Sequence, residues 1–356
     1  MSLKIYVGMS GGVDSSLTAA LLKESGYDVV GVYMKNWTKD LPGFNCPWQE
    51  DFNDAKRVAV QLDIPFKVYD LEKDYRQKVV DYLLEGYKSG LTPNPDIMCN
   101  QEIKFKLFLD LAMADGADKI ATGHYARIIN QTNNYRLKTG IDLNKDQSYF
   151  LYQMSNVALE KSLMPIGEYL KPNVRKLATE RKLFTANKKD SQGICFVGKV
   201  GIKDFLTAEL GVQPIGQIID DKNQVIGEHD GALYYTIGQR HGLNLGGGLP
   251  YYVTGKDMIK NIVYVTRNIQ DPMLWSKNIN LTNMHWLNKS IKTLSSKDRV
   301  MVRVRYRAPF VSVKSLKQIS DDKWQLELSE EVKAIAVGQS VVFYQDDYVL
   351  GGGIIN

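Results

Sequence analysis

The chain has 356 residues, of which 44% are hydrophobic and 24% are charged. Its length exceeds the size at which a single core usually stops growing, so we expect two or three domains, and its balanced composition excludes a wholly disordered protein. The formal charge of +5 only weakly indicates a polyanionic partner, and no apolar run approaches the roughly 20 residues that span a bilayer.

Three cysteines lie at widely separated positions, Cys46, Cys99 and Cys195. An odd number without a C-x-x-C pair excludes a disulfide framework, a zinc ribbon and a thioredoxin-like motif. The sequence starts with a strand-like run and lacks the charged-then-apolar layout of a signal peptide. We therefore expect a cytoplasmic protein with no membrane segment, in which reduced thiols are available for chemistry.

Residues 1 to about 160 alternate strand-like apolar runs with amphipathic helical runs. The expected strands are 5–9, 29–34, 66–70 and 119–122, and the expected helices are 15–25, 52–62, 74–86 and 103–115. Alternation of this kind predicts a parallel sheet that is covered by helices on both faces.

Short β-rich runs replace the helical periodicity after about residue 200. They comprise residues 217–219, 232–236, 251–254, 262–266, 300–306, 311–316, 324–328 and 340–344. Evenly spaced short strands are typical of a small barrel or sandwich. We therefore expect an α/β fold with a parallel-sheet domain over residues 1–198, a small mixed or β-rich domain over 199–271 and an antiparallel β-barrel over 272–356.

A glycine-rich run follows the first expected strand and opens the first expected helix: Gly8, Met9, Ser10, Gly11, Gly12, Val13, Asp14 and Ser15. Glycines allow close approach to an anion, and a helix N-terminus offers unpaired N–H groups with a positive dipole end. A glycine-rich turn without a ligand is common, but the string Ser-Gly-Gly-Val-Asp-Ser is far more restrictive. It resembles the signature of the PP-loop ATP pyrophosphatases, which bind the pyrophosphate of ATP at this loop.

Two of the cysteines lie in runs that are typical of loops. Cys99 ends a run rich in proline and turn-forming residues, and the expected helix 103–115 begins shortly after it, which favours a lowered pKa. Cys195 follows the basic pair Lys188-Lys189, and neighbouring cations also favour a thiolate. A lone cysteine is more often a small buried hydrophobe than a reactive group, and we interpret Cys46 as structural or incidental. Spacing alone does not show whether the other two meet.

Positive charge concentrates between residues 289 and 317, where nine Lys or Arg accompany one acid. Within 300–307, a row of Val and Tyr residues alternates with Met301 and three arginines, so a strand there would place Arg303, Arg305 and Arg307 on one face. A solvated strand face is the alternative interpretation. Such clustering favours polyanion binding, because each phosphate contact releases counterions.

Seven motifs occur in an order and spacing that resemble those of one family. They are Gly8–Ser15, Asn94-Pro-Asp-Ile-Met-Cys99, Gly123-His-Tyr125, Lys145-Asp-Gln-Ser-Tyr149, Gly193-Ile-Cys-Phe196, Tyr235-Thr-Ile-Gly-Gln-Arg240 and Gly351-Gly-Gly353. Over its whole length the chain is similar to the tRNA-specific 2-thiouridylases, which convert the wobble uridine of certain tRNAs to 2-thiouridine. The resemblance implies an N-terminal PP-loop domain of the adenine nucleotide α-hydrolase-like type.

The resemblance also implies a role for each motif. The ATP site would comprise the loop Gly8 to Ser15 with Met34 and Gly123, and the target base would be approached by Asn94, Pro95 and Asp96. Cys195 would carry the persulfide sulfur, and Cys99 would act as nucleophile and end in a disulfide with Cys195. Contacts to tRNA would come from His124, Lys145, Asp146, Gln147, Arg305, Tyr306 and Gln339. No residue is expected to ligate a metal.

The implied chemistry requires ATP and a sulfur source. The C2 carbonyl oxygen of uracil is a poor leaving group, so ATP would adenylate it while Mg²⁺ offsets the charge of the departing pyrophosphate. A persulfide on Cys195 would supply the sulfur, and Cys99 would complete its release by thiol–disulfide exchange. The implied partners are wobble-uridine tRNAs, expected to be those for Lys, Glu and Gln, and a cysteine desulfurase or sulfur-carrier protein.

Two other functions fit part of the sequence. A PP-loop ligase or amidotransferase would keep the ATP chemistry without sulfur, but no glutaminase segment is visible. A non-catalytic RNA-binding protein would carry a decayed nucleotide site, whereas the loop from Ser10 to Ser15 and both loop cysteines are intact. The sulfur-transferring enzyme therefore accounts for more of the sequence than either alternative.

Overall fold

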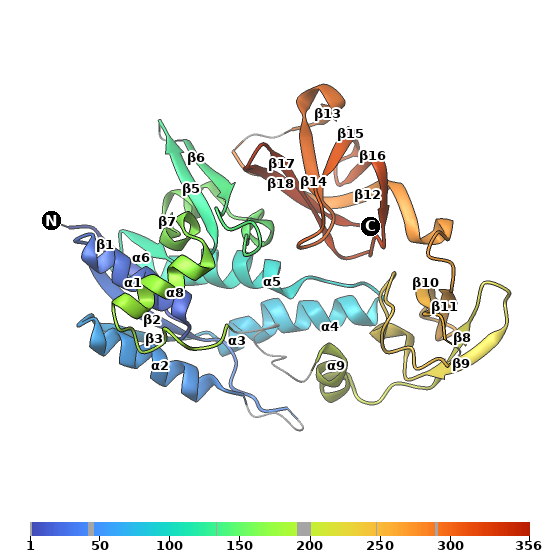
Figure 1. The fold of residues 1–356 in the computed structure, drawn as a ribbon, viewed down its shortest axis with the longest axis horizontal. Helices are drawn as coiled ribbons and strands as arrows, with labels where there is room; N and C mark the ends of the chain where they lie inside the picture. The colour runs from blue at the N-terminus through green and yellow to red at the C-terminus, as the bar shows by residue number, and fades with distance from the viewer. Residues whose placement is uncertain (1, 42–45, 133, 191–200, 247, 289–290) are drawn as a thin grey trace.

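The computed structural model describes residues 2–356 except 42–45, 133, 191–200, 247 and 289–290. Three β-sheets organise the described residues (Figure 1). A helix-covered sheet forms the N-terminal body, a barrel lies beside it, and a small sheet lies at the far end of the molecule from the N-terminus. None of the helices in the described ranges is long and apolar enough to cross a membrane.

The first sheet is parallel and has the order β3-β2-β1-β4-β7. Its strands are β1 (Lys4–Gly8), β2 (Asp28–Lys35), β3 (Phe66–Asp70), β4 (Lys119–Ala121) and β7 (Ser162–Leu163). Side chains of β1 alternate between the two faces, so Ile5 packs with Val58 of α2 (Trp48–Gln61) while Tyr6 packs with Phe108. The covered parallel sheet is confirmed.

Helices α1 (Val13–Glu24) and α8 (Lys171–Glu180) pack together beside this sheet, and their buried side chains share one apolar cluster. Val13 and Leu17 of α1 meet Val174 and Ala178 of α8 in that cluster. The N-termini of both helices thereby come close to the end of β1, which positions the residues of the candidate site.

Two helical segments contain π-helical turns that the sequence pattern did not predict. One consists of α3 (Glu72–Tyr75), η1 (Arg76–Val80) and α4 (Asp81–Lys88), and the other of α5 (Pro95–Met98), η2 (Cys99–Leu107) and α6 (Phe108–Ala114). The expectation that Cys99 lies in a loop before a helix is wrong, because helical structure begins at Pro95 after the N-cap Asn94. Rare π-helical turns are frequently found at functional sites.

The C-terminal strands form a closed antiparallel barrel, as expected. The strands are β12 (Trp275–Trp286), β13 (Thr293–Ser295), β14 (Val300–Arg303), β15 (Val311–Ser320), β16 (Lys323–Lys333), β17 (Ser340–Gln345) and β18 (Tyr348–Ile355). Six of them close the barrel because β12 pairs with both β16 and β18. The expected strand 300–306 is too long, since β14 ends at Arg303.

A hairpin from the N-terminal body extends the barrel sheet. Strands β5 (Ala126–Gln131) and β6 (Asn134–Thr139), which sequence reasoning missed, join β18 through the pairing of Lys138 with Tyr348. The following 3-10 helix η3 (Ser148–Leu151) also reaches the barrel, where the Tyr149 hydroxyl donates a 2.8 Å hydrogen bond to the Ser340 carbonyl. The body and the barrel therefore share one apolar core.

The central sheet has the order β10-β11-β8-β9. Its strands are β8 (Gly216–Ile219), β9 (Val225–His229), β10 (Tyr252–Asp257) and β11 (Ile262–Thr266), and helix α9 (Ile202–Leu210) precedes them. The expected strand 232–236 is wrong, because its first residues form the 3-10 helix η5 (Ala232–Tyr234). The remaining short elements are α7 (Asn156–Glu160), η4 (Pro165–Glu168), η6 (Pro272–Leu274) and η7 (Ser296–Asp298).

Candidate active site

The glycine-rich run Gly8–Ser15, called the phosphate loop after its expected ligand, connects β1 to α1 at the carboxyl end of the parallel sheet, where open sheets of this kind bind ligands. Gly11 has a φ of +74°, and a Cβ at this position would lie 2.3 Å from the backbone oxygen of Asp51. Only glycine fits such a place. Gly12 is the extended N-cap of α1, and it has no side chain to compete with an anion for the first N–H groups of the helix.

Hydroxyl groups hold the loop in shape. The backbone N–H of Ser10 donates to Ser15 Oγ at 3.1 Å, and the two serine hydroxyl oxygens lie 3.3 Å apart. Ser15 Oγ also donates to the Gly12 carbonyl at 3.2 Å. Met9 and Val13 are buried and anchor the two ends of the loop in the core. The loop is thus preorganised by its own residues.

Met34 and Gly123, which the resemblance assigns to the ATP site, both pack against the loop or the helix turn that follows it. A Cβ at Gly8 would lie 2.9 Å from Met34 Cε, so this methionine packs against the start of the loop. A Cβ at Gly123 would lie 2.8 Å from the backbone C of Asp14 and the backbone N of Ser15. The segment after β4 therefore packs directly on the first turn of α1, and glycine is required for this approach.

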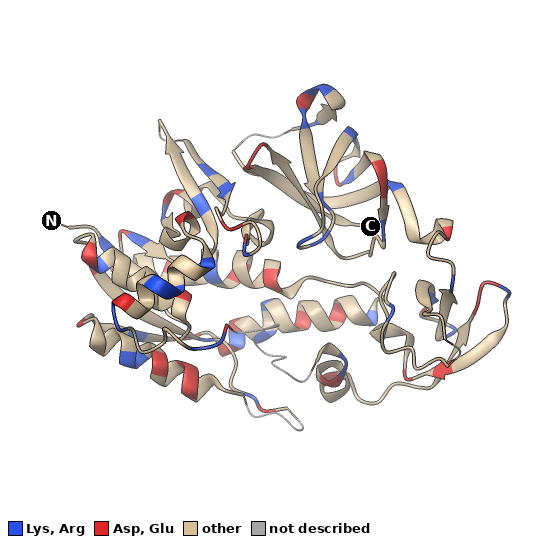
Figure 2. Ribbon diagram, in the orientation of Figure 1, with Lys and Arg blue, Asp and Glu red and all other residues tan. Residues whose placement is uncertain are grey.

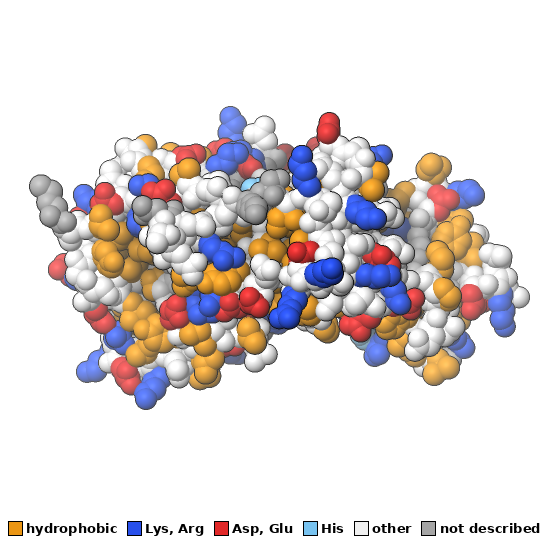
Figure 3. Space-filling model, turned by 90° about the horizontal axis from the view of Figure 1, so that it is seen from above, with side chains coloured by type: hydrophobic (Ala, Val, Ile, Leu, Met, Phe, Trp, Pro, Cys, Tyr) orange, Lys and Arg blue, Asp and Glu red, His pale blue; other side chains and the backbone are white. Residues whose placement is uncertain are grey.

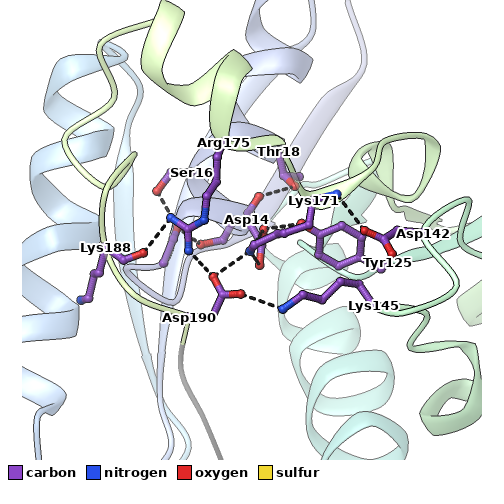
Figure 4. Close-up of polar contacts among 12 residues, drawn as sticks. Asp14, Ser16, Thr18, Tyr125, Asp142, Lys145, Lys171, Arg175, Lys188 and Asp190 are labelled. Carbon is purple, nitrogen blue, oxygen red and sulfur yellow. Dashed lines mark hydrogen bonds and ion pairs between the residues drawn. The ribbon is translucent and has the colours of Figure 1, made fainter. Parts of the chain in front are cut away.

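An ion-pair network lies beside that first turn (Figure 4). The Tyr125 hydroxyl donates a 2.7 Å hydrogen bond to Asp14 Oδ1, and Lys171 Nζ lies 2.8 Å from both carboxylate oxygens of Asp14. Lys171 Nζ also lies 2.9 Å from Asp190 Oδ1, while Lys145 Nζ contacts the other oxygen of Asp190 at 2.9 Å. Burial, reinforced by the charge of Asp14, raises the pKa of Tyr125, which therefore stays a hydroxyl donor.

Asp190 is fixed by three cations. Burial disfavours its ionised form, but hydrogen bonds from Lys145 and Lys171 outweigh this effect and lower the pKa of Asp190 to about 2. Arg175 donates to Asp190 Oδ1 at 2.5 Å and to the carbonyl of Lys188 at 3.0 Å. Figure 2 shows Lys and Arg residues along α8 and on the segment that follows it. The chain is thereby anchored to α8 as far as Asp190.

The run before Cys99 forms the start of α5. Asn94 Oδ1 accepts hydrogen bonds from the backbone N–H of Asp96 at 3.2 Å and of the following residue at 3.3 Å, and Pro95 occupies the first turn. Burial raises the pKa of the Asp96 carboxyl, and the charge of Lys104 partly offsets this effect. The Asp96 carboxyl is therefore partly buried, lies about one helical turn before Cys99 and holds a proton more tightly than an ordinary aspartate does.

The three cysteines differ in their surroundings. Cys99 is 5% exposed at the start of η2 and belongs to the same apolar cluster as Ile103. Cys195 lies outside the described residues, so its relation to Cys99 remains a prediction. The backbone N–H of Cys46 donates to Asp40 Oδ1 at 2.7 Å, which ties it into a local turn.

His124 is buried and neutral. Burial, and then the charge of Lys104, lowers its pKa well below the usual value. Lys104 Nζ lies 3.4 Å from His124 Nε2, and an ammonium group can only donate. The proton of the imidazole is therefore on Nδ1, which donates to Thr122 Oγ1 at 2.7 Å. His124 is only 7% exposed, whereas Lys104 is partly exposed. Lys104 therefore lies nearer to solvent than the imidazole ring does.

The motif Lys145-Asp-Gln147 is engaged within the protein. Lys145 pairs with Asp190 as described, and Gln147 Oε1 accepts a 2.9 Å hydrogen bond from the backbone N–H of Tyr125. Asp146 is 1% exposed and lies 3.0 Å from Arg303 Nη1. The expected face of three arginines on β14 is therefore wrong, because Arg303 points into the protein toward Asp146.

The remaining residues expected to contact tRNA lie on the barrel. Arg305 is exposed, and the Tyr306 ring packs at 4.3 Å between centroids on Phe150. Gln339 donates from its side-chain amide to the Thr92 carbonyl at 2.7 Å. Figure 3 shows basic side chains gathered over the barrel, beside a hollow that apolar side chains line.

Known proteins resemble this chain over its full length. Consecutive family models match residues 3–199 as a tRNA methyl transferase HUP domain, 203–267 as a tRNA methyl transferase PRC-barrel domain and 276–355 as an aminomethyltransferase beta-barrel domain. The proteins named tRNA-specific 2-thiouridylase MnmA from Bacillus velezensis and Bacillus subtilis are each 47% identical to it over 99% of this chain and 95% of their own. That from Geobacillus thermodenitrificans is 46% identical over 99% and 94%.

The chain belongs to the tRNA-specific 2-thiouridylase family. This is a family of tRNA sulfurtransferases, so the expected enzyme class is confirmed. A solved structure titled a 4-thiouridine synthetase–RNA complex with bound ATP is 16% identical, with a TM-score of 0.38 over 55% of this chain and 45% of its own.

Several residues of this candidate site were missed by sequence reasoning. Lys171, Asp190 and Thr92 belong to none of the seven motifs described above. Tyr125 does belong to one of them, Gly123-His-Tyr125. Lys171 follows a leucine and precedes a proline, a pattern that signals a helix start and nothing more. Its role depends on the packing of α8 against α1, which no local pattern reveals.

Within the described ranges, no group of three or more His, Cys, Asp or Glu side chains is placed to hold a metal ion. Both oxygens of Asp14, the acid of the phosphate loop, are already taken by Lys171 and Tyr125. A magnesium ion that arrives with a nucleotide would therefore be held chiefly by phosphate oxygens and water, as is common for this ion.

Proposed function

We propose that the protein performs the ATP-dependent 2-thiolation of the wobble uridine, position 34, of tRNA. The observation that carries the proposal is the similarity to the 2-thiouridylases over 99% of the chain. The preorganised loop from Ser10 to Ser15 supports the use of ATP. The protein acts on tRNAs for Lys, Glu and Gln, receives persulfide from a cysteine desulfurase or sulfur carrier, and works in the cytoplasm.

The first chemical step activates the base with MgATP. The C2 oxygen of uracil attacks the α-phosphorus, the N3–H proton passes to the carboxylate of Asp96, and the bond to the β-phosphate oxygen breaks to release pyrophosphate. The raised pKa of Asp96 suits a general base that must hold this proton. The N-terminus of α1 stabilises the negative charge of the phosphates.

The second step transfers sulfur. The terminal sulfur of a persulfide on Cys195 attacks C2, and the bond from C2 to the adenylated oxygen breaks to release AMP. The Cys99 thiolate then attacks the Cys195 Sγ, which forms a Cys99–Cys195 disulfide and leaves the sulfur on the base. A thiol reductant restores both cysteines for the next turnover.

We assign these roles to three domains. The domain of residues 1–198 binds ATP and performs catalysis, and the domains of residues 199–271 and 272–356 bind tRNA. Two observations support the last assignment: basic side chains gather over the barrel in Figure 3, and Arg305 is exposed. His124 and Asp146 are buried, and Lys145 and Gln147 are engaged with Asp190 and with the backbone of Tyr125, so we infer that the tRNA contacts lie chiefly at Arg305 and Tyr306.

The test uses the full chain with tRNA transcripts, MgATP and a cysteine desulfurase with cysteine. Nucleoside mass spectrometry should detect 2-thiouridine, with AMP and pyrophosphate formed in equal amounts. A transcript with cytidine at position 34 is the control and should remain unmodified. Incorporation of ammonia instead of sulfur would support the ligase alternative, and tRNA binding without ATP turnover would support the non-catalytic one.

A further inference from the structure

Lys171 is held at the beginning of α8 by the backbone around it. Its N–H donates a 2.9 Å hydrogen bond to Asp142 Oδ2, and Pro172 follows in the first turn of the helix. Asp142 is itself 8% exposed and accepts from the backbone N–H of Asn144. The start of α8, and with it the origin of the Lys171 side chain, is thus fixed.

The ammonium group of Lys171 is directed at two carboxylates. It contacts both oxygens of Asp14 at 2.8 Å and Oδ1 of Asp190 at 2.9 Å, and it lies 5.6 Å from the ring centroid of Tyr125 (Figure 4). The side chain is only 10% exposed. Lysine is almost never buried to this extent unless it is paired, so these contacts determine where it lies.

An acidic side chain such as that of Asp14 is unexpected in a site that binds an anion. Its carboxylate belongs to the first turn of α1, where the loop geometry would receive phosphate groups, and an unpaired negative charge there would repel them. Lys171 compensates this charge and, with the Tyr125 hydroxyl, fixes the direction in which the carboxylate points. Around Asp14 and Asp190, the three cations Lys145, Lys171 and Arg175 leave a positive excess.

We propose that Lys171 is a positioning residue for ATP: it neutralises Asp14 and holds that carboxylate aside, so that the N-terminus of α1 receives the triphosphate. The inference rests on the proposed function in that ATP is the nucleotide used. Lys171 acts through Asp14 and needs no contact with the phosphates. Removal of the Lys171 side chain should therefore lower the affinity for ATP more than it lowers the rate of base thiolation.

The first experiment compares Lys171→Met, Lys171→Arg and a control, Lys176→Met. Lys176 lies on the same helix, its side chain is 75% exposed, and among the described residues it pairs with Glu180 at 3.9 Å. Calorimetric titration with MgATP should show at least about tenfold weaker binding for Lys171→Met, as expected for loss of a charged hydrogen bond. The KM for ATP should rise in parallel, whereas kcat and the KM for tRNA stay near wild type. Lys171→Arg should recover most of the affinity, and the control should equal wild type.

The second experiment is a double-mutant cycle with Asp14→Asn, read by MgATP binding. If Lys171 acts by neutralising Asp14, Lys171→Met should cost little in the Asp14→Asn background. Equal costs in both backgrounds would overturn the proposal, because Lys171 would then contact the phosphates directly. So would wild-type affinity in Lys171→Met, or a parallel loss of kcat, tRNA affinity and melting temperature, which would indicate a structural role. Failure of the wild type itself to thiolate tRNA while it binds ATP would refute the proposed function and leave the role of Lys171 intact.

Discussion

The side-chain amide of Gln339 donates a 2.7 Å hydrogen bond to the backbone carbonyl of Thr92. The N–H of Thr92 donates in turn to the Val337 carbonyl at 2.8 Å, and its hydroxyl lies 3.1 Å from that of Thr236. The body, the barrel and the central region therefore meet at a single residue, two positions before Asn94. The run that leads to Cys99 is fixed at its start by all three.

We predict that Gln339→Ala lowers the free energy of unfolding by about 1 kcal/mol, the usual net value of one hydrogen bond. It should also reduce kcat for thiolation while ATP binding is unchanged, because the Asn94–Cys99 run loses part of its support. Gln345→Ala, which removes an exposed amide bonded to the Asp298 carbonyl at 3.0 Å, is the control and should keep wild-type kcat. If Gln339 contacted tRNA instead, its variant would weaken tRNA binding without any loss of thermal stability.

The buried pair of Arg303 and Asp146 makes a pH-dependent prediction. Arg303→Met should lower the free energy of unfolding by about 3–5 kcal/mol at neutral pH, because it leaves a buried carboxylate unpaired. Burial already raises the pKa of Asp146 above its ordinary 3.8, and loss of Arg303 raises it further. The native state then binds the proton more tightly than the unfolded state, so stability falls as pH rises from 3.8 through the folded pKa.

Denaturant unfolding of Arg303→Met at several pH values checks this sign. The deficit relative to wild type should shrink as the pH is lowered toward the range in which Asp146 becomes protonated. A deficit that stays constant or grows on acidification would contradict the buried-pair interpretation. Arg305→Ala, at an exposed position, serves as the control and should have little effect on stability at any pH.

The exposed arginines should govern tRNA binding. Arg305→Ala with Arg307→Ala should weaken tRNA binding and flatten the plot of log affinity against log salt by about one unit of slope per lost phosphate contact. A filter-binding titration at several salt concentrations measures both quantities. The control removes two exposed lysines of the body, Lys56 and Lys176, and should leave the slope unchanged. An unaltered slope in the arginine variant would place the tRNA elsewhere.

Gly123→Ala should impair the nucleotide site. The new Cβ would lie 2.8 Å from the backbone of Asp14 and Ser15, so the first turn of α1 must shift. We expect a higher KM for ATP and unchanged tRNA affinity in steady-state kinetics. Gly246→Ala is a suitable control because its Cβ meets nothing within 4 Å. Normal ATP kinetics in Gly123→Ala would show that the nucleotide does not depend on this packing.

The cysteines test the order of the sulfur steps. Cys195→Ser should prevent persulfide loading, whereas Cys99→Ser should allow loading and block turnover. After one turnover without reductant, peptide mapping of the wild type should find a Cys99–Cys195 disulfide. Two free thiols after product formation would contradict the mechanism. Cys46→Ser is the control and should behave as wild type, because the backbone contact to Asp40 is kept and a serine hydroxyl can donate to the Trp37 carbonyl, as the thiol does at 3.7 Å.

Local patterns in the sequence were sufficient for the parallel sheet, the barrel and the phosphate loop. Each depends on a short-range signal: apolar periodicity, evenly spaced strands, or glycines that open a helix. Cys99 shows where such signals stop being reliable, because prolines and turn formers indicated a loop whereas Asn94 and Pro95 in fact begin a helix. The same residue types favour turns and helix N-termini, so their pattern does not distinguish the two.

Only the tertiary structure decided which charged residues remain available to a ligand. The alternation in 300–307 placed Arg303 with Arg305, yet Arg303 pairs with Asp146, 157 positions away in sequence. Lys171 reaches Asp14 across the same separation, and Gln339 reaches Thr92 across 247 positions. A charge is satisfied by whichever partner the fold brings within a few ångströms, and in a buried site such pairing dominates because water no longer competes for the charge.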